Sequence, residues 1–184
     1  MTLDQFSNEI LLNIVKQDAE NEKERLILKI NNMRSIRAKL KVINREFETS
    51  KRFIANLLLT NKRFSVLGKK CYAPVLKNIL ELNFVDAIKR SNFNKVGSHG
   101  INHLTVALFE IAKNGDDDFA GIIYLLVKSG ANVNAQDVYG ETPLHHAHDD
   151  EIIAKALIAA GAEKYIRDCD GELPYYGGIC CTIL

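Results

Sequence analysis

The stretch that decides the fold is residues 137–147, Asp137-Val-Tyr-Gly-Glu-Thr-Pro-Leu-His-His-Ala147. Gly140 can take the positive φ of a tight turn without the steric cost of a Cβ atom. Thr142 is a residue type that caps helices, and Pro143 suits the first helical position, where its missing N–H has no intrahelical partner. Leu144 and the last alanine, three residues apart, share one helical face. The stretch therefore predicts a turn followed at once by a helix.

The same pattern recurs along the chain. Residues 168–174 repeat the Asp, Gly, Glu and Pro of residues 137–143 at an offset of 31. Two apolar stretches that end in Gly-Ala, residues 125–131 and 156–162, are also 31 apart. Upstream, residues 100–107 match the deciding stretch at an offset of 40. Repetition at this period indicates stacked units, each too small to bury its apolar face alone.

The repeat resembles the ankyrin repeat, because residues 140–147 (Gly-x-Thr-Pro-Leu-His-x-Ala) nearly reproduce that family's signature. The resemblance implies helix pairs joined by projecting turns, with His145 making structural hydrogen bonds. Gly130 and Gly161 follow apolar helices, where a left-handed C-terminal cap is expected. The repeats are expected at about 72–99, 100–136 and 137–167, with a partial repeat from 168.

The second repeat departs from the family pattern at two places. His103 stands where the family usually has Pro, and about nine residues are inserted around Asp116. Gly beside an acidic run is typical of a loop between helices. The same acidic loop could instead be a contact for a specific partner, and the sequence leaves both interpretations open.

The resemblance also implies that the repeats bind a protein target through their concave face and their turn tips. The residues expected to make these contacts are Asn134, Gln136, Val138, Tyr139, Arg167 and Cys169.

Residues 1–70 contain no Pro and one Gly, and they carry apolar stripes at helical spacing in the segments 10–15, 26–30 and 36–58. Three stripes predict three amphipathic helices in a small bundle. The fold class is therefore all-α, with a three-helix module at 1–70, an ankyrin solenoid at 71–178 and a tail at 179–184.

Two segments of this module resemble an F-box. Residues 6–14 are similar to its opening, and residues 36–47 are similar to its second helix. An F-box implies binding to Skp1 and so recruitment of a cullin-1 ubiquitin ligase. Ser7 stands where the family has Pro, and about fourteen extra residues separate the two segments. The alternative is a plain helical cap on the repeats, which needs the same apolar stripes. The Skp1-binding residues under the first interpretation are Phe6, Glu9, Ile10, Ile14, Ile36, Leu40, Ile43 and Phe47.

Charge divides the chain in two. Residues 1–70 carry 15 Lys and Arg against 8 Asp and Glu, and residues 71–184 carry 9 against 15. Opposite signs suggest modules with different partners, although solvated helix faces explain the charges equally well. Few aromatic residues accompany the basic ones, and Glu46 and Glu48 interrupt them, so a nucleic-acid partner is not expected.

The chain ends Cys181-Thr-Ile-Leu184, which is similar to a C-a-a-X prenylation box whose final Leu favours geranylgeranyl. Cys180 would then be a palmitoylation site and supply a second membrane anchor. The alternative is a chance cysteine near a terminus. Neither a secretory signal nor a transmembrane stretch is recognisable, so we expect a cytoplasmic protein, in a host cytosol or at a membrane after prenylation.

The sequence predicts no enzyme, cofactor or metal site. It contains neither a Gly-rich phosphate loop nor a nucleophile elbow. His145 and His148 are three apart, but no third ligand follows at a useful spacing. The expected function is that of an adaptor between a target and a ubiquitin ligase, a layout similar to F-box and ankyrin effectors of intracellular bacteria. The alternative is an ankyrin scaffold without a ligase link.

Overall fold

The computed structural model describes residues 8–60, 69–95, 101–114, 117–148 and 150–174. No β-strand occurs within these ranges, which confirms the all-α prediction. The helices are α1 (Asn8–Asn31), α2 (Ile36–Thr60), α3 (Lys69–Arg90), η3 (Asn92–Asn94), α4 (His103–Asn114), η4 (Asp117–Phe119), α5 (Ala120–Lys128), α6 (Pro143–His146) and α7 (Glu151–Ala159).

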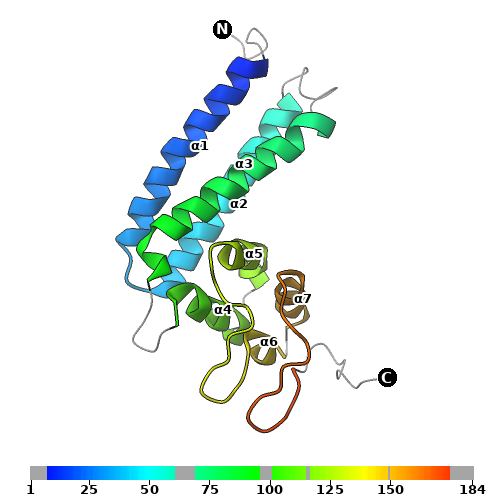
Figure 1. The fold of residues 1–184 in the computed structure, drawn as a ribbon. Helices are drawn as coiled ribbons and strands as arrows, with labels where there is room; N and C mark the ends of the chain where they lie inside the picture. Colours follow the sequence, from blue (N-terminus) through cyan, green and yellow to red (C-terminus); the bar gives the residue numbers. More distant parts are fainter. Residues whose placement is uncertain (1–7, 61–68, 96–100, 115–116, 149, 175–184) are drawn as a thin grey trace.

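Three long helices, α1, α2 and α3, form one end of the molecule (Figure 1). The first two apolar stripes lie on the single helix α1, so the prediction of two separate helices there was wrong. The polar residues between the stripes continue this helix, and Lys23 pairs with Glu20 at 2.5 Å on the same helix. Lys23 also reaches Asp86 on α3 at 3.1 Å. The third helix of this end is therefore α3.

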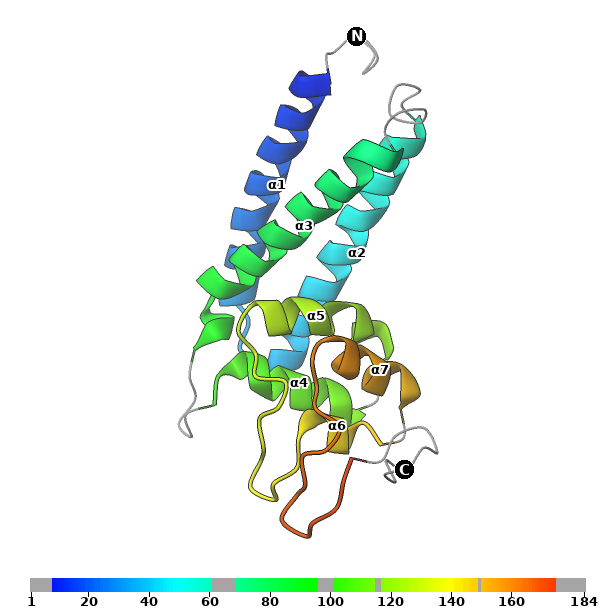
Figure 2. The ribbon, with the colours of Figure 1, turned by 45° about the vertical axis from the view of Figure 1, so that its right-hand side comes forward.

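The short helices form two layers. α4 packs against α6 and α5 packs against α7, and the turns after α5 and α7 project past α6 as two neighbouring fingers (Figures 1 and 2). We call residues 129–142 finger 1 and residues 160–172 finger 2. Gly140 and Gly171, with φ of 77° and 82°, occupy equivalent positions in them. Each finger thus follows a helix and carries two positive-φ glycines, one after the helix and one near its tip.

One hydrophobic core runs from α1 to α7 without interruption. At the junction of the long helices, the rings of Phe47 and Phe84 meet edge to face, with centroids 5.2 Å apart. The proposed boundary at residues 70 and 71 falls within α3, and residues 72–90 lie in this single helix. The long helices therefore share their core with the helix pairs, and the domain limits stay a prediction.

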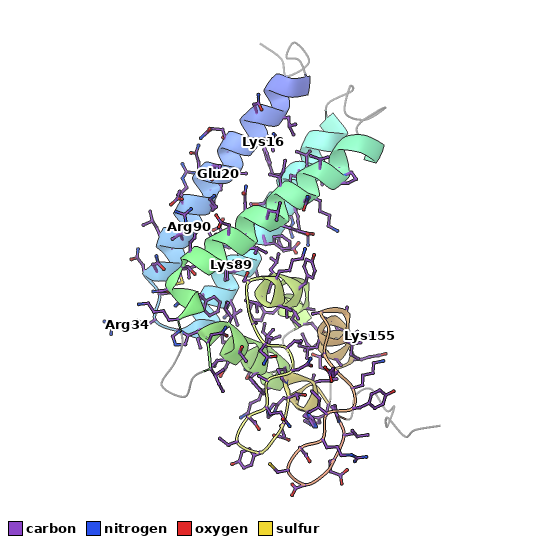
Figure 3. The ribbon with its side chains drawn as sticks, viewed as in Figure 1. Lys16, Glu20, Arg34, Lys89, Arg90 and Lys155 are labelled. Atoms are coloured by element: carbon purple, nitrogen blue, oxygen red, sulfur yellow. The ribbon has the colours of Figure 1, made fainter. Side chains whose placement is uncertain are left out.

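Several basic side chains on the long helices pair with acidic residues of the same chain. Figure 3 labels Lys16 on α1 and Lys89 and Arg90 on α3. Lys29 on α1 donates a hydrogen bond to Glu46 on α2 at 2.9 Å, and this bond lowers the pKa of Glu46 more than burial raises it. Lys39 is only 4% exposed, and its ammonium donates to Asn92 at 2.7 Å. Within the described ranges, no helix has the length and apolar character needed to cross a membrane.

Candidate protein-binding surface

The tip of finger 1 is held by one carboxylate. Asp137 Oδ1 accepts hydrogen bonds from the backbone N–H groups of Tyr139 (2.9 Å) and Glu141 (3.0 Å). The backbone N–H of Asp137 donates to the Glu141 carbonyl at 2.9 Å, which closes the turn. Between these bonds, Val138 is 87% exposed and Tyr139 is 69% exposed. The turn thus presents two adjacent apolar side chains on a backbone held by its own hydrogen bonds.

The two fingers are joined by hydrogen bonds. The Cys169 N–H donates to the Tyr139 carbonyl at 2.9 Å. Gln136 Nε2 donates to the carbonyls of Gly140 (2.7 Å) and Arg167 (3.1 Å). We predicted that Gln136 contacts a target, and the structure shows that its amide group bridges the fingers.

Asn134 makes a similar bridge nearer the helices. Its Oδ1 accepts from the Glu163 N–H at 2.9 Å, and its Nδ2 donates to the Gly161 carbonyl at 3.3 Å. The side-chain amides of Asn134 and Gln136 therefore set the spacing of the fingers, and the other two predicted contacts on finger 1, Val138 and Tyr139, have exposed side chains.

His145 fixes the root of finger 1. Its Nδ1 accepts the Thr142 N–H at 2.9 Å, so in a neutral ring Nε2 carries the proton and donates to the Glu172 carbonyl at 3.4 Å. Thr142 is the N-cap of α6 and Pro143 lies at its start, as the sequence predicts. The structural role that the ankyrin resemblance implied for His145 is confirmed.

The neighbouring His146 lies in a cluster that the sequence did not reveal. Its Nε2 is 3.0 Å from Asp137 Oδ2 and 3.5 Å from Glu141 Oε2, and its ring meets Phe109 edge to face at 5.5 Å. Burial alone would raise the pKa of Asp137, but hydrogen bonds from His146 and from two backbone N–H groups lower it overall. The turn folds back over five residues and brings Asp137 next to His146. Sequence spacing alone does not show this proximity.

Finger 2 repeats the turn of finger 1. Asp168 Oδ1 accepts from the N–H groups of Asp170 (3.0 Å) and Glu172 (2.8 Å). Arg167, a predicted contact, is exposed, and its guanidinium donates to the Gly171 carbonyl at 2.5 Å. Tyr165 is 69% exposed and was not predicted, although it lies 31 residues after Asn134. Cys169 is exposed and carries a free thiol.

The predicted Skp1-binding residues that the structure describes are buried or partly buried. Leu40, Ile43 and Phe47 are 1%, 0% and 6% exposed, so their side chains lie in the chain's own core. Ile36 is partly buried against the same core. Glu9, Ile10 and Ile14 belong to α1, but their side chains are outside the described set. Phe6, Cys180 and Cys181 also lie outside the described residues.

A stack of helix pairs with projecting fingers is an all-α repeat architecture suited to holding a macromolecule. Residues 139–169 match the family model of the ankyrin repeat. This match covers the C-terminal part of finger 1, α6, α7 and most of finger 2. Together with the relatives described next, it supports an ankyrin-repeat protein.

Three relatives illustrate the similarity. The human protein phosphatase 1 regulatory subunit 27 is 33% identical over 103 residues, which are 50% of this chain and 65% of the relative. An ankyrin repeat protein of Acanthamoeba polyphaga mimivirus, L271, is 22% identical over 69% of this chain and 17% of the relative. The ADP-ribosylation factor GTPase-activating protein AGD2 of Arabidopsis thaliana is 35% identical over 48% of this chain and 11% of the relative.

The chain spans less than two thirds of the length of each of these relatives. The ankyrin match points to a protein that interacts with other proteins.

Proposed function

We propose that this protein is an adaptor that binds a target protein through fingers 1 and 2. The observation that carries the proposal is the exposure of Val138 (87%) and Tyr139 (69%) on a turn whose backbone is already hydrogen-bonded. Because the turn is ordered before binding, little conformational entropy is lost when a partner covers it. Aromatic residues at such positions contribute strongly to protein interfaces. Tyr165 extends the apolar surface onto finger 2.

The phosphatase-subunit relative suggests a first partner to test. Its name describes a regulatory subunit of protein phosphatase 1, so the catalytic subunit of that phosphatase is the natural probe. We expect binding in isothermal titration calorimetry, weakened by at least about tenfold in the Val138→Ser, Tyr139→Ser double variant. Ile152→Ser is the matched control, because Ile152 is 53% exposed and belongs to α7, not to either finger. Equal binding by both variants would exclude the fingers as the contact surface.

Recruitment of a cullin-1 ligase through Skp1 is a finer hypothesis within the adaptor proposal, and a role as an effector in a host cell depends on it. Three of its predicted contact residues are buried, so Skp1 would have to use other side chains or open α2. A pull-down with purified Skp1 tests it. If Skp1 does not bind, or if it binds the Phe6→Ala, Ile10→Ala double variant equally well, the hypothesis of a ligase link is rejected.

Without Skp1 binding, the long helices are a cap for the repeats. The continuous core supports this alternative, because it extends from α1 through α3 into the helix pairs. Stacked repeats need such caps, since a terminal unit otherwise exposes its apolar face. The protein would then be an ankyrin scaffold that works through its fingers alone.

Membrane association is a separate hypothesis about the tail. Prenylation of Cys181, with palmitoylation of Cys180, would hold an otherwise cytoplasmic adaptor at a membrane. Intact-mass measurement after expression in eukaryotic cells tests it. The hypothesis requires the added mass of a prenyl group in the wild type and none in Cys181→Ser.

A further inference from the structure

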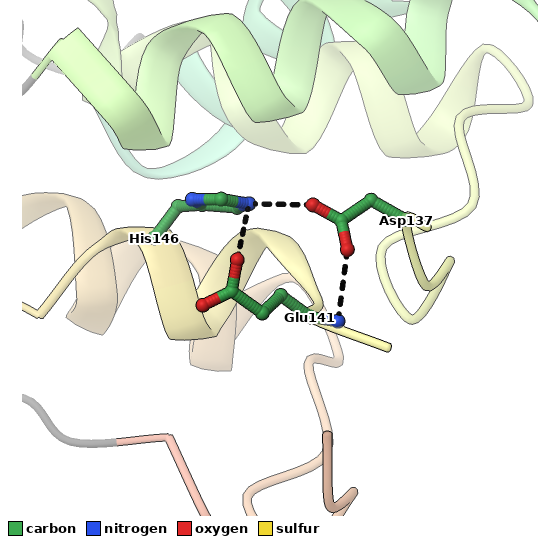
Figure 4. A group of neighbouring side chains, drawn as sticks. All are labelled: Asp137, Glu141 and His146. Atoms are coloured by element: carbon green, nitrogen blue, oxygen red, sulfur yellow. Dashed lines mark hydrogen bonds and ion pairs between the residues drawn. The ribbon is translucent and has the colours of Figure 1, made fainter. Parts of the chain in front are cut away.

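Three side chains that can ligate a metal meet at the root of finger 1, as Figure 4 shows. Asp137 comes from the start of the turn, Glu141 from its end and His146 from α6. One ligating atom from each lies within 4.8 Å of the other two. We propose that this cluster binds a divalent transition-metal ion, with Zn²⁺ as its best probe.

The spacing of the ligating atoms fits a small ion. Zinc is bound by imidazole nitrogen and carboxylate oxygen at about 2.0–2.2 Å, which places neighbouring ligand atoms of a tetrahedral site roughly 3.3 Å apart. His146 Nε2 is 3.0 Å from Asp137 Oδ2 and 3.5 Å from Glu141 Oε2. All three ligand atoms lie within 4.8 Å of one another, so side-chain rotations that draw the two carboxylates together would place them around one ion.

Charge favours an ion in the same place. Two carboxylates converge on one imidazole nitrogen, which has a single proton to share between them. The imidazole can carry at most one positive charge, so even when protonated it balances only one of the two negative groups. A divalent ion can balance both, and imidazole nitrogen and carboxylate oxygen are each ligand types that zinc accepts.

The surroundings orient the ligands as the outer shell of a metal site does. Asp137 Oδ1 is committed to the N–H groups of Tyr139 and Glu141, which leaves Oδ2 directed toward His146. The Phe109 ring packs against the edge of the imidazole. The side chains of His146, Asp137 and Glu141 are 20%, 25% and 34% exposed, so solvent water can complete the coordination.

Finger 2 provides a comparison inside the same molecule. Asp168 and Glu172 repeat the two carboxylates and the same turn. The residue 31 positions after His146 is Gly177, so this pair has no equivalent histidine. The proposal therefore assigns the ion to finger 1 alone. A bound ion would join the turn that carries Val138 and Tyr139 to α6 and hold those two side chains in place.

The test uses the full chain, freed of metal by chelation, kept reduced and titrated with ZnCl₂ in a calorimeter. We expect one saturable site in the wild type, weakened by at least about tenfold in Glu141→Gln and in His146→Ala. Glu172→Gln is the matched control and should bind as the wild type does. Glu141→Gln should fold normally, because the backbone of Glu141, not its side chain, bonds to Asp137.

Cobalt provides a second readout, since the visible absorption of bound Co²⁺ reports its ligands directly. The wild type and Glu172→Gln should give the same spectrum, and Glu141→Gln should lose it. Absence of a saturable site, or zinc binding that persists unchanged in both Glu141→Gln and His146→Ala, would overturn the proposal and leave the cluster as an ion pair. Either result is independent of whether the fingers bind a protein.

Discussion

Gly140→Ala is the substitution whose effect the structure defines most closely. Gly140 has a φ of 77°, a conformation that costs an L-residue roughly 1–2 kcal/mol. A Cβ atom built there would lie 2.8 Å from the backbone nitrogen of Cys169 and 3.0 Å from its sulfur. Since the nearest atom is backbone, finger 2 would have to move away.

That movement weakens the hydrogen bond from the Cys169 N–H to the Tyr139 carbonyl, which is 2.9 Å long. Losing one such bond costs about 0.5–1.5 kcal/mol. In the opposite direction, alanine lowers the conformational entropy of the unfolded chain, which stabilises the folded state by about 0.4–1 kcal/mol. We therefore expect Gly140→Ala to lower the free energy of unfolding by about 0.5–3 kcal/mol, measured by urea denaturation followed by circular dichroism.

Gly171→Ala is the matched control. Gly171 has nearly the same φ, 82°, but a Cβ atom added there would meet no atom within 4 Å. Gly171→Ala should therefore lose stability only through the unfavourable backbone conformation. Gly140→Ala also weakens a hydrogen bond, so its free energy of unfolding should fall by about 1 kcal/mol more. Equal losses in the two variants would refute the claim that the fingers are packed against each other at Gly140.

Three further predictions concern the core, His145 and Asp137. Phe47→Ala should lower the free energy of unfolding by about 3–5 kcal/mol. Because the long helices share one core with the repeats, the variant should still unfold in a single thermal transition, at a lower Tm. Two separate transitions would contradict the shared core. His145→Ala should cost about 1–3 kcal/mol in urea denaturation because it leaves the Thr142 N–H without its partner, and an unchanged midpoint would contradict this role. The folded-state pKa of Asp137 is depressed, so its charge stabilises the fold above the ordinary carboxyl pKa and this contribution is lost as pH falls through the folded value. The stability difference between wild type and Asp137→Asn should therefore be constant near neutral pH and shrink in acid, and a difference independent of pH would contradict the assignment.

The parts of the fold that follow local rules were predictable. Thr142, Pro143 and Gly140 each suit the backbone position that the repeat pattern predicts for them, and the structure places each in it. The single helix α1 was missed because residues 16–25 are polar and interrupt the apolar stripe. These residues are nonetheless good helix formers, and ion pairs such as Arg25 with Glu22 at 2.6 Å support them.

The site was less predictable than the fold. Val138 and Tyr139 follow from the repeat pattern, and their exposure agrees with a contact role. The bridging role of Gln136 depends on the distance between two fingers 31 residues apart, which no local pattern contains. The cluster at His146 similarly depends on how tightly the turn folds back.

The most direct test of the adaptor proposal is site-specific photo-cross-linking. A benzophenone amino acid is placed at Tyr139 or, as the control, at Ile152, both of which are exposed. In an extract of cells that express the chain, position 139 should give a discrete protein adduct. Excess wild-type protein should compete this adduct away, and the Val138→Ser, Tyr139→Ser variant should not. Absence of an adduct at 139, or the same adducts at 139 and 152, would contradict the claim that the fingers hold a protein partner.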